Sequence, residues 1–511
     1  MHHPSLVASL AAATLLVPIT APAASDADIA ELKTMLRSMK TDYEQRIREL
    51  ERRLARAERT AAATAAATAP AHAHSEPMSA PSVTPPSPAA SAPPRHASFA
   101  ALTSGTAFNP QIAVILDGNY YHDGRDGDGA ALVGQALQPS GGHAHDHDHT
   151  DDAAAGHTHS HGSADNGFNF REAELTFSAT VDPYFDAAAY LAVTDAGDVH
   201  LEEAWLQTRN LPAGLRVKAG KFFSDFGYVN KQHPHQWEFV DQNLPYLNLL
   251  GDHGLQDKGI QITWLPTLPV YTLLGVELLQ GNQEVFGATL DAAEQAELHL
   301  DDTQDGPRLW TVFAKVAPEL GTQHALQFGV SYAHTDQHQE VHAHTHAGED
   351  VVHENALAGD ADLWGLDAVY KYDGTGAGGQ GDVKVQAEYL RSIKDLSIAS
   401  SPHPDVVGSA RQFTTDGFYA QAVYGFAPNW TAGLRYDVLG PTNEVSGGTT
   451  DDFGASDRWT VNVTWKLSEF SQLRAQYAYN DILVADDERE RFDAVYLQFV
   501  MSMGSHGAHA F

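Results

Sequence analysis

The sequence of 511 residues contains no cysteine. This absence excludes disulfide bonds, thiolate zinc sites and cysteine nucleophiles together. Basic residues are also scarce, because 31 Lys and Arg stand against 66 Asp and Glu, which gives a formal net charge of −35. A nucleic-acid-binding protein needs a basic face, so this balance argues against nucleic acid as a partner and favours cations.

Long apolar runs are missing beyond the N-terminus. After the first 25 residues, no apolar run reaches the roughly 18 residues that a transmembrane helix requires. A helical membrane protein is therefore excluded. Catalytic motifs are missing as well, because the sequence has no Gly-x-Ser-x-Gly elbow, no His-Glu-x-x-His helix and no Gly-x-x-x-x-Gly-Lys phosphate loop. We therefore expect no enzyme and no prosthetic group.

The first 24 residues have the pattern of a secretory signal peptide. An apolar stretch runs from Leu6 to Ile19, and the small residues Ala21, Ala23 and Ala24 suit signal-peptidase cleavage. The segment departs from the pattern in having no Lys or Arg before the apolar stretch. We expect export, and the alternative is a buried helix of the mature protein.

Residues 26–60 are highly charged and helical in period. Their apolar residues are spaced three and four apart, which predicts a short coiled coil, and a homotrimer is the assembly we expect. A single solvated helix with i,i+4 ion pairs is the alternative. Residues 61–107 are rich in Ala and Pro and predict a linker that does not pack.

From residue 108 to 511 the period changes to two. In Arg458–Leu467, for example, Trp459, Val461 and Val463 alternate with polar residues. Clean alternation over about ten residues is typical of strands that cross an outer membrane, with an apolar side toward lipid. Sixteen strands are predicted, near 111–121, 169–181, 185–194, 199–208, 214–223, 258–266, 270–280, 308–317, 323–334, 361–372, 381–391, 412–426, 429–438, 457–467, 471–480 and 490–503.

The predicted connections alternate between long and short. The odd-numbered connections are mostly long, among them 122–168, 224–257 and 335–360, whereas the even-numbered ones are short turns rich in Pro, Gly and Asp. Long extracellular loops and short periplasmic turns give this asymmetry in bacterial barrels. We therefore predict an all-β transmembrane barrel of about 16 antiparallel strands in the lipid of the bacterial outer membrane. A soluble β-sandwich or propeller is the alternative.

Histidine is abundant, and it is concentrated in two of the predicted outer loops. The sequence has 28 histidines, and the segment GGHAHDHDHTDDAAAGHTHSHG in loop 122–168 repeats them at every second position. Neutral imidazoles mixed with carboxylates are suitable ligands for zinc, nickel or copper, and binding should weaken as pH falls. We interpret the loops as fluctuating chelating segments, and a solvated low-complexity loop is the alternative. The candidate ligands are His143, His145, His147, His149, His157, His159, His161, His338, His342, His344 and His346.

The connection 224–257 differs from the other long loops, because it is rich in aromatic residues. It also carries His233, His235 and Asp241, which we take as candidate metal ligands. By strand order it is the third outer loop, which in general porins folds into the lumen and narrows it. We expect either a constriction with a metal contact or an aromatic plug that closes the mouth.

Three segments carry a resemblance to a known family. They are FNPQIAVILDGNYYH at 108–122, LEEAWLQTRNLPAGLRVKAGKF at 201–222 and, most specifically, HPHQWEFVD at 233–241. In these the chain resembles the zinc-regulated outer-membrane porin-like proteins, often labelled zinc-regulated TonB-dependent outer-membrane receptors. The resemblance implies a barrel made under zinc limitation, with histidine-rich segments that assist zinc capture.

The layout of the chain favours passive over energised transport. A TonB-dependent receptor needs a globular plug and a 22-stranded barrel, whereas a coiled coil and a linker precede about sixteen strands here. We expect a porin-like channel that captures and passes divalent metal ions, most of all zinc. The alternatives are a TonB-energised zinc receptor and a surface metal-buffering barrel without conductance.

Overall fold

The computed structural model describes residues 111–134, 136, 164–345, 352–447, 451–452, 454–485 and 488–504. The signal peptide, the coiled coil, the linker and the seven histidines predicted as ligands at 143–161 therefore lie outside the described residues. No helix among the described residues is long and apolar enough to cross a membrane.

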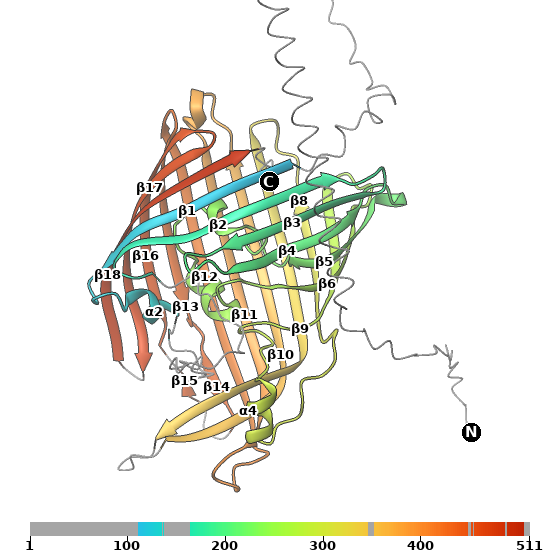
Figure 1. Ribbon diagram of the computed structural model, residues 1–511, viewed down its shortest axis with the longest axis vertical. Helices are drawn as coiled ribbons and strands as arrows, with labels where there is room; N and C mark the ends of the chain where they lie inside the picture. The colour runs from blue at the N-terminus through green and yellow to red at the C-terminus, as the bar shows by residue number, and fades with distance from the viewer. Residues whose placement is uncertain are drawn as a thin grey trace, which may run out of the picture. The chain divides into compact units, whose positions relative to one another are not determined.

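The described residues form a closed antiparallel barrel (Figure 1). Along the wall each strand pairs with the next wall strand, with β13 pairing directly with β16, and the first strand, β1, pairs with the last, β18. Strands β14 and β15 belong to the connection between β13 and β16, and the other sixteen strands of the described part make the wall. This confirms the predicted sixteen-stranded antiparallel barrel.

The strand bounds follow the alternation of the sequence. The strands are β1 (Gln111–Asp123), β2 (Gly167–Thr180), β3 (Phe185–Val193), β4 (Val199–Thr208), β5 (Leu215–Phe223), β6 (Gln256–Trp264), β7 (Tyr271–Leu279), β8 (Leu309–Ala317), β9 (His324–Thr345), β10 (Val352–Tyr372), β11 (Val383–Ser400), β12 (Ala410–Ala427), β13 (Trp430–Leu439), β14 (Glu444–Ser446), β15 (Asp451–Asp452), β16 (Ser456–Ser468), β17 (Ser471–Ala485) and β18 (Glu488–Gly504). The helical elements are α2 (Gly129–Gly134), α3 (Leu244–Leu250), α4 (Ala292–Glu297), η2 (Pro212–Gly214), η3 (Pro234–Gln236) and η4 (Ala377–Gly379).

The two faces of the wall differ as the alternation predicts. On β16 the side chains of Val461 and Val463 are exposed, whereas Thr460 and Asn462 are buried inside the barrel. Aromatic residues mark two levels of the outer face. Trp430 and Trp465 stack at 5.3 Å near the short turns, and a second set that includes the neighbouring rings of Tyr436 and Trp459 lies six residues farther along the strands. Two such belts are typical of barrels that span a bilayer.

One predicted loop is wrong. The connection 335–360 was expected to be a fluctuating chelating loop, but β9 continues to Thr345 and β10 begins at Val352, so most of it is a paired hairpin. A register shift between Gly359 and Ala361 marks a bulge, and pairing resumes beyond it. Tertiary pairing thus overrides the low-complexity appearance of this segment.

Candidate functional site

Residues 224–255, between β5 and β6, fold into the barrel and cross its interior; we call them the inward loop. Its backbone receives hydrogen bonds from inward side chains of opposite walls, because Lys315 of β8 donates to Gly227 O at 2.7 Å and Asn462 of β16 donates to Glu238 O at 2.7 Å. Gln476 of β17 accepts from Val240 N at 2.8 Å. The third outer loop therefore narrows the lumen, as the sequence predicts.

A buried carboxylate fixes the first part of the inward loop. Glu388 of β11 accepts from the backbone N–H groups of Tyr228 and Val229 at 2.7 and 3.1 Å. It also accepts from the hydroxyl of Tyr246 at 2.8 Å and from that of Tyr419. One side chain of the wall thus satisfies four donors, three of them on the inward loop, where an unpaired donor would be costly.

Two arginines fix the middle of the inward loop. Asp241 accepts from Arg435 at 2.9 Å and pairs with Arg458 at 2.8 Å, and both arginines also pair with the buried Asp437. Burial alone would raise the pKa of Asp241, but Arg435 and Arg458 lower it to about 2. Asp241 was a candidate metal ligand, and the structure places it instead between two guanidinium groups that neutralise it.

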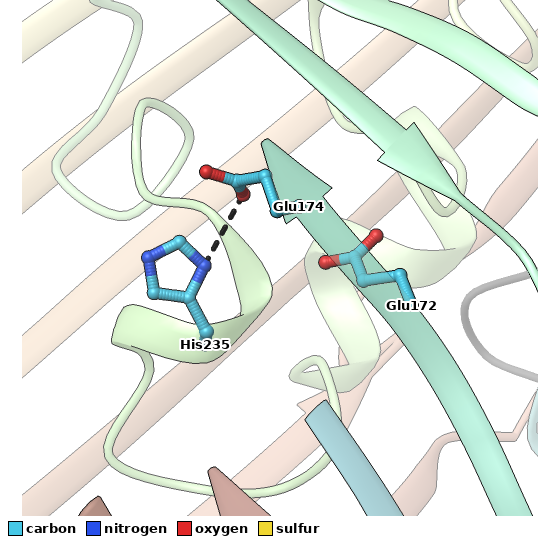
Figure 2. Close-up of side chains that lie close together, drawn as sticks. All are labelled: Glu172, Glu174 and His235. Carbon is cyan, nitrogen blue, oxygen red and sulfur yellow. Dashed lines mark ion pairs between the residues drawn. The ribbon is translucent and has the colours of Figure 1, made fainter. Parts of the chain in front are cut away.

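The two candidate histidines lie on the inward loop between the part that Glu388 holds and Asp241. Pro234 begins the 3-10 turn η3, and its fixed φ suits the first position of such a turn. The turn holds His233 and His235 on the same side, with ring centroids 5.8 Å apart. Figure 2 shows His235 on this turn, facing the carboxylate of Glu174 on β2, with Glu172 beside it. Both predicted histidines therefore lie inside the barrel.

Four carboxylates of the wall surround these imidazoles. Glu172 and Glu174 occupy successive inward positions of β2 and are buried. Strand β4 supplies two adjacent carboxylates, Glu202 and Glu203, which are both buried although neighbouring residues of a strand normally face opposite ways. The reason is a register shift between β3 and β4, in which Glu202 is the extra residue of a bulge.

The six residues Glu172, Glu174, Glu202, Glu203, His233 and His235 form what we call the His–Glu cluster. His233 Nδ1 lies 3.0 Å from Glu174 Oε2 and 3.2 Å from Glu202 Oε2, and its Nε2 lies 2.9 Å from Glu203 Oε1. His235 Nδ1 lies 3.2 Å from the same Glu174 Oε2. Burial alone would lower the pKa of His233, but Glu174, then Glu202 and Glu203, outweigh burial and raise the pKa well above its ordinary value. The cluster attracts cations.

The remaining candidate histidines are distributed differently. His338 and His342 lie on β9, and their Nε2 atoms lie 2.9 and 2.8 Å from the two oxygens of Glu340. Lys394 also donates to Glu340 at 2.6 Å, so a cation already occupies this carboxylate. His344 belongs to β9, and His346 lies outside the described residues. Strand pairing holds His338 and His342 in place, so these two do not belong to a fluctuating loop.

The four carboxylates of the His–Glu cluster were missed from the sequence. Alternation along β2 already places Glu172 and Glu174 on the polar face, but it does not say which loop they meet. Glu202 and Glu203 could not be placed on one face, because the alternation that predicts a strand assigns them to opposite faces. Only the combination of the bulge and the inward loop brings all four together.

A cavity of about 440 Å³ lies beside the inward loop. The space would hold roughly fifteen water molecules at their liquid volume. Its lining is largely polar and includes Asn119, Arg171, Asp241, Arg458 and Tyr496. Small hydrated solutes thus have room within the barrel next to the loop that narrows it.

Comparisons with known proteins agree with this architecture. Residues 149–504 match the family described as phosphate-selective porin O and P. An uncharacterised protein of Aquifex aeolicus (strain VF5) is 32% identical over 425 residues, which cover 80% of this chain and 81% of that protein.

Solved structures with a similar fold include two channels of low identity. The outer-membrane channel DcaP of Acinetobacter baumannii is 13% identical, with a TM-score of 0.44 over 78% of this chain and 99% of its own. An anion-selective porin from Comamonas acidovorans is 11% identical, with a TM-score of 0.41 over 77% and 99%. From the family match and the closed barrel, the chain belongs to the family of phosphate-selective porins O and P and is a porin of the bacterial outer membrane.

Proposed function

We propose that this porin captures and passes divalent transition-metal ions, most of all zinc. The observation that carries the proposal is the His–Glu cluster, in which the inward loop holds His233 and His235 against buried carboxylates inside the barrel. Imidazole and carboxylate together are typical ligands of such ions. The histidine-rich outer segments would raise the local metal concentration at the mouth, and the net negative charge would attract cations toward it. Synthesis under zinc limitation belongs to the same proposal.

Phosphate is the second candidate, because the name of the family includes it. Three of the arginines inside the barrel are already paired with carboxylates, which weakens their support for phosphate. Arg435 and Arg458 are paired with Asp241 and Asp437, and Arg171 is paired with Asp117 at 3.2 Å. A phosphate ion would have to compete with these carboxylates for the same guanidinium groups.

Conductance of the full-length mature protein in a planar bilayer tests the two candidates. We expect a cation-selective current that micromolar zinc on one face modulates at pH 7.5 and much less at pH 5.5, because protons compete with the metal for imidazole nitrogens. Replacement of both His233 and His235 by Ala should weaken the zinc effect by about tenfold or more. His403→Ala, on the outer connection between β11 and β12, is the matched control.

The reversal potential in a salt gradient decides between the substrates. An anion-selective current that responds to phosphate and ignores zinc would contradict the metal proposal in favour of phosphate. A silent bilayer at both pH values would favour energised uptake or a metal-buffering barrel without conductance.

The homotrimer is part of the proposal and rests on the heptad pattern of residues 26–60. We expect chemical crosslinking of the intact protein in native membranes to give a ladder that ends at the trimer. Deletion of residues 26–60 should reduce the trimer band while the barrel still migrates as a folded species in gels of unheated samples. A monomer pattern in both proteins would contradict the trimer.

A further inference from the structure

We propose that the His–Glu cluster is a two-metal site in which Glu174 bridges two divalent transition-metal ions. One ion would be bound by Glu174, Glu202 and His233, and the other by Glu172, Glu174 and His235. In each of these groups the ligand atoms lie within 4.8 Å of one another. The site deepens the proposed function, on which its role in transport depends, but its existence can be tested separately.

The distances within the cluster fit a metal ion. Ligands about 2.0–2.1 Å from a tetrahedral zinc ion lie about 3.3 Å from each other. His233 Nδ1 lies 3.0 Å from Glu174 and 3.2 Å from Glu202, and His235 Nδ1 lies 3.2 Å from Glu174. Both imidazoles approach the same oxygen of Glu174, which therefore occupies the bridging position between the two groups.

Three of the proposed ligands, Glu174, Glu202 and His233, have buried atoms without the hydrogen bonds that burial ordinarily requires. Glu174 is fully buried, and neither of its oxygens accepts a hydrogen bond of ordinary geometry from any residue that the structure describes. Within the same part of the chain, Oε2 of Glu202 and Nδ1 of His233 also have no hydrogen bond of that kind. Buried polar groups of native proteins are normally satisfied, and an ion bound between these atoms would satisfy them.

The other nitrogen of His233 supports the same interpretation. Nε2 lies 2.9 Å from Glu203 Oε1, so its N–H group donates to this carboxylate. Metal-binding histidines usually donate their second N–H to a carboxylate, which fixes the tautomer and directs the free nitrogen toward the metal. Glu203 is therefore a positioning residue, and Nδ1 of His233 faces Glu174 and Glu202.

The charges of the cluster also fit two ions. Four carboxylates balance two divalent cations when the imidazoles are neutral. The lysine and arginine that act electrostatically on the cluster have other partners, because Arg171 pairs with Asp117 at 3.2 Å and Lys221 donates to Leu201 O at 2.8 Å. Four buried carboxylates without such compensation would be costly to fold.

The ligands come from two separate parts of the fold. The carboxylates belong to β2 and β4 of the wall, whereas the imidazoles belong to the inward loop, with His233 directly before the turn η3 and His235 within it. Bound ions would therefore add a connection between the loop and the wall besides its anchors at Glu388 and Asp241. Occupancy of the site should reduce the motion of the inward loop.

Crystals of the full mature protein soaked in zinc chloride test the proposal through anomalous diffraction above and below the zinc edge. We expect two peaks, one on each side of Glu174 and about 3.5–4 Å apart, as in other two-metal sites. Glu174→Gln should remove both peaks, and Glu202→Gln should remove the peak beside His233. Glu238→Gln is the matched control, because Glu238 lies on the same loop but pairs with Lys384 at 2.5 Å.

Hydrogen exchange in solution provides a second measurement. It is read from peptides of the inward loop, so zinc bound to the outer histidines does not contribute to it. Zinc should slow exchange in peptides of residues 224–255 at least several-fold in the wild type and in Glu238→Gln, but not in Glu174→Gln. Migration of unheated samples in gels confirms that each variant is folded. No peaks and no protection would mean that the cluster is an ion-pair network, and a single peak would overturn the bridging role of Glu174.

Failure of the site and failure of the proposed function give different results. Two peaks together with a current that ignores zinc would support the site and contradict metal transport. A current that zinc modulates, without peaks at the cluster, would overturn the site and assign the zinc effect to the outer segments.

Discussion

Replacement of Glu388 by Ala is expected to release the inward loop and to raise the single-channel conductance. The side chain accepts from Tyr228 N, Val229 N and the hydroxyls of Tyr246 and Tyr419. Loss of this acceptor leaves buried donors unpaired at about 1–3 kcal/mol each. With three of these donors on the inward loop, the loop should lose roughly 3–9 kcal/mol of local stability, while strand pairing holds the barrel together.

Glu388→Gln is the matched control, because an amide keeps one acceptor oxygen at the same position. We expect its conductance to lie close to that of the wild type, with somewhat more current noise. The measurement is the distribution of single-channel conductance in a planar bilayer, together with hydrogen exchange of residues 224–255. Equal conductance and equal exchange in Glu388→Ala and the wild type would show that Glu388 does not hold the loop.

Replacement of Asp241 by Ala should destabilise the protein more than any surface substitution. Asp241 neutralises Arg435 and Arg458, and both of these guanidinium groups are buried. Removal of one partner from a buried ion pair typically costs about 3–5 kcal/mol, because it leaves an uncompensated charge. The measurement is the urea midpoint of the gel-shift unfolding transition. Asp225→Ala, which removes a loop carboxylate that pairs with Lys231 at 3.4 Å, is the comparison.

The same residue predicts how the inward loop responds to pH. The pKa of Asp241 is lowered to about 2, below its ordinary value of 3.8, so the ion pairs stabilise the loop fully above pH 4 and are lost only as pH falls toward 2. Asp241 is therefore ionised at both pH 7.5 and pH 5.5. A loss of the zinc effect at pH 5.5 is therefore not caused by release of this anchor.

The barrel could be predicted from the sequence because each strand carries its own signal. In β16, for example, apolar Val461 and Val463 alternate with polar Thr460 and Asn462, and this local pattern reports which face meets lipid. The inward loop could be predicted as well, from its aromatic composition and its place in the strand order. Both predictions depend on residues that are close together in the sequence.

The carboxylates of the His–Glu cluster could not be predicted, because they depend on long-range geometry. Glu174 meets His233 only because the inward loop turns back to β2, 59 positions earlier in the sequence. Glu202 and Glu203 share a face only because of the bulge opposite Tyr190 and Leu191. Asp241 looked like a ligand for the same reason, since its partners Arg435 and Arg458 follow it by 194 and 217 residues.

The hairpin of β9 and β10 gives the barrel an uneven height. Its strands have 22 and 21 residues, whereas β5 to β8 have nine each. About ten residues of a strand suffice to cross the hydrocarbon layer, so β9 has about 40 Å of strand to spare at roughly 3.3 Å per residue. The excess length forms a hydrogen-bonded flap in which β9 and β10 remain paired beyond the part of the wall that the membrane needs. Antibodies and phages approaching the cell would therefore meet an ordered epitope here.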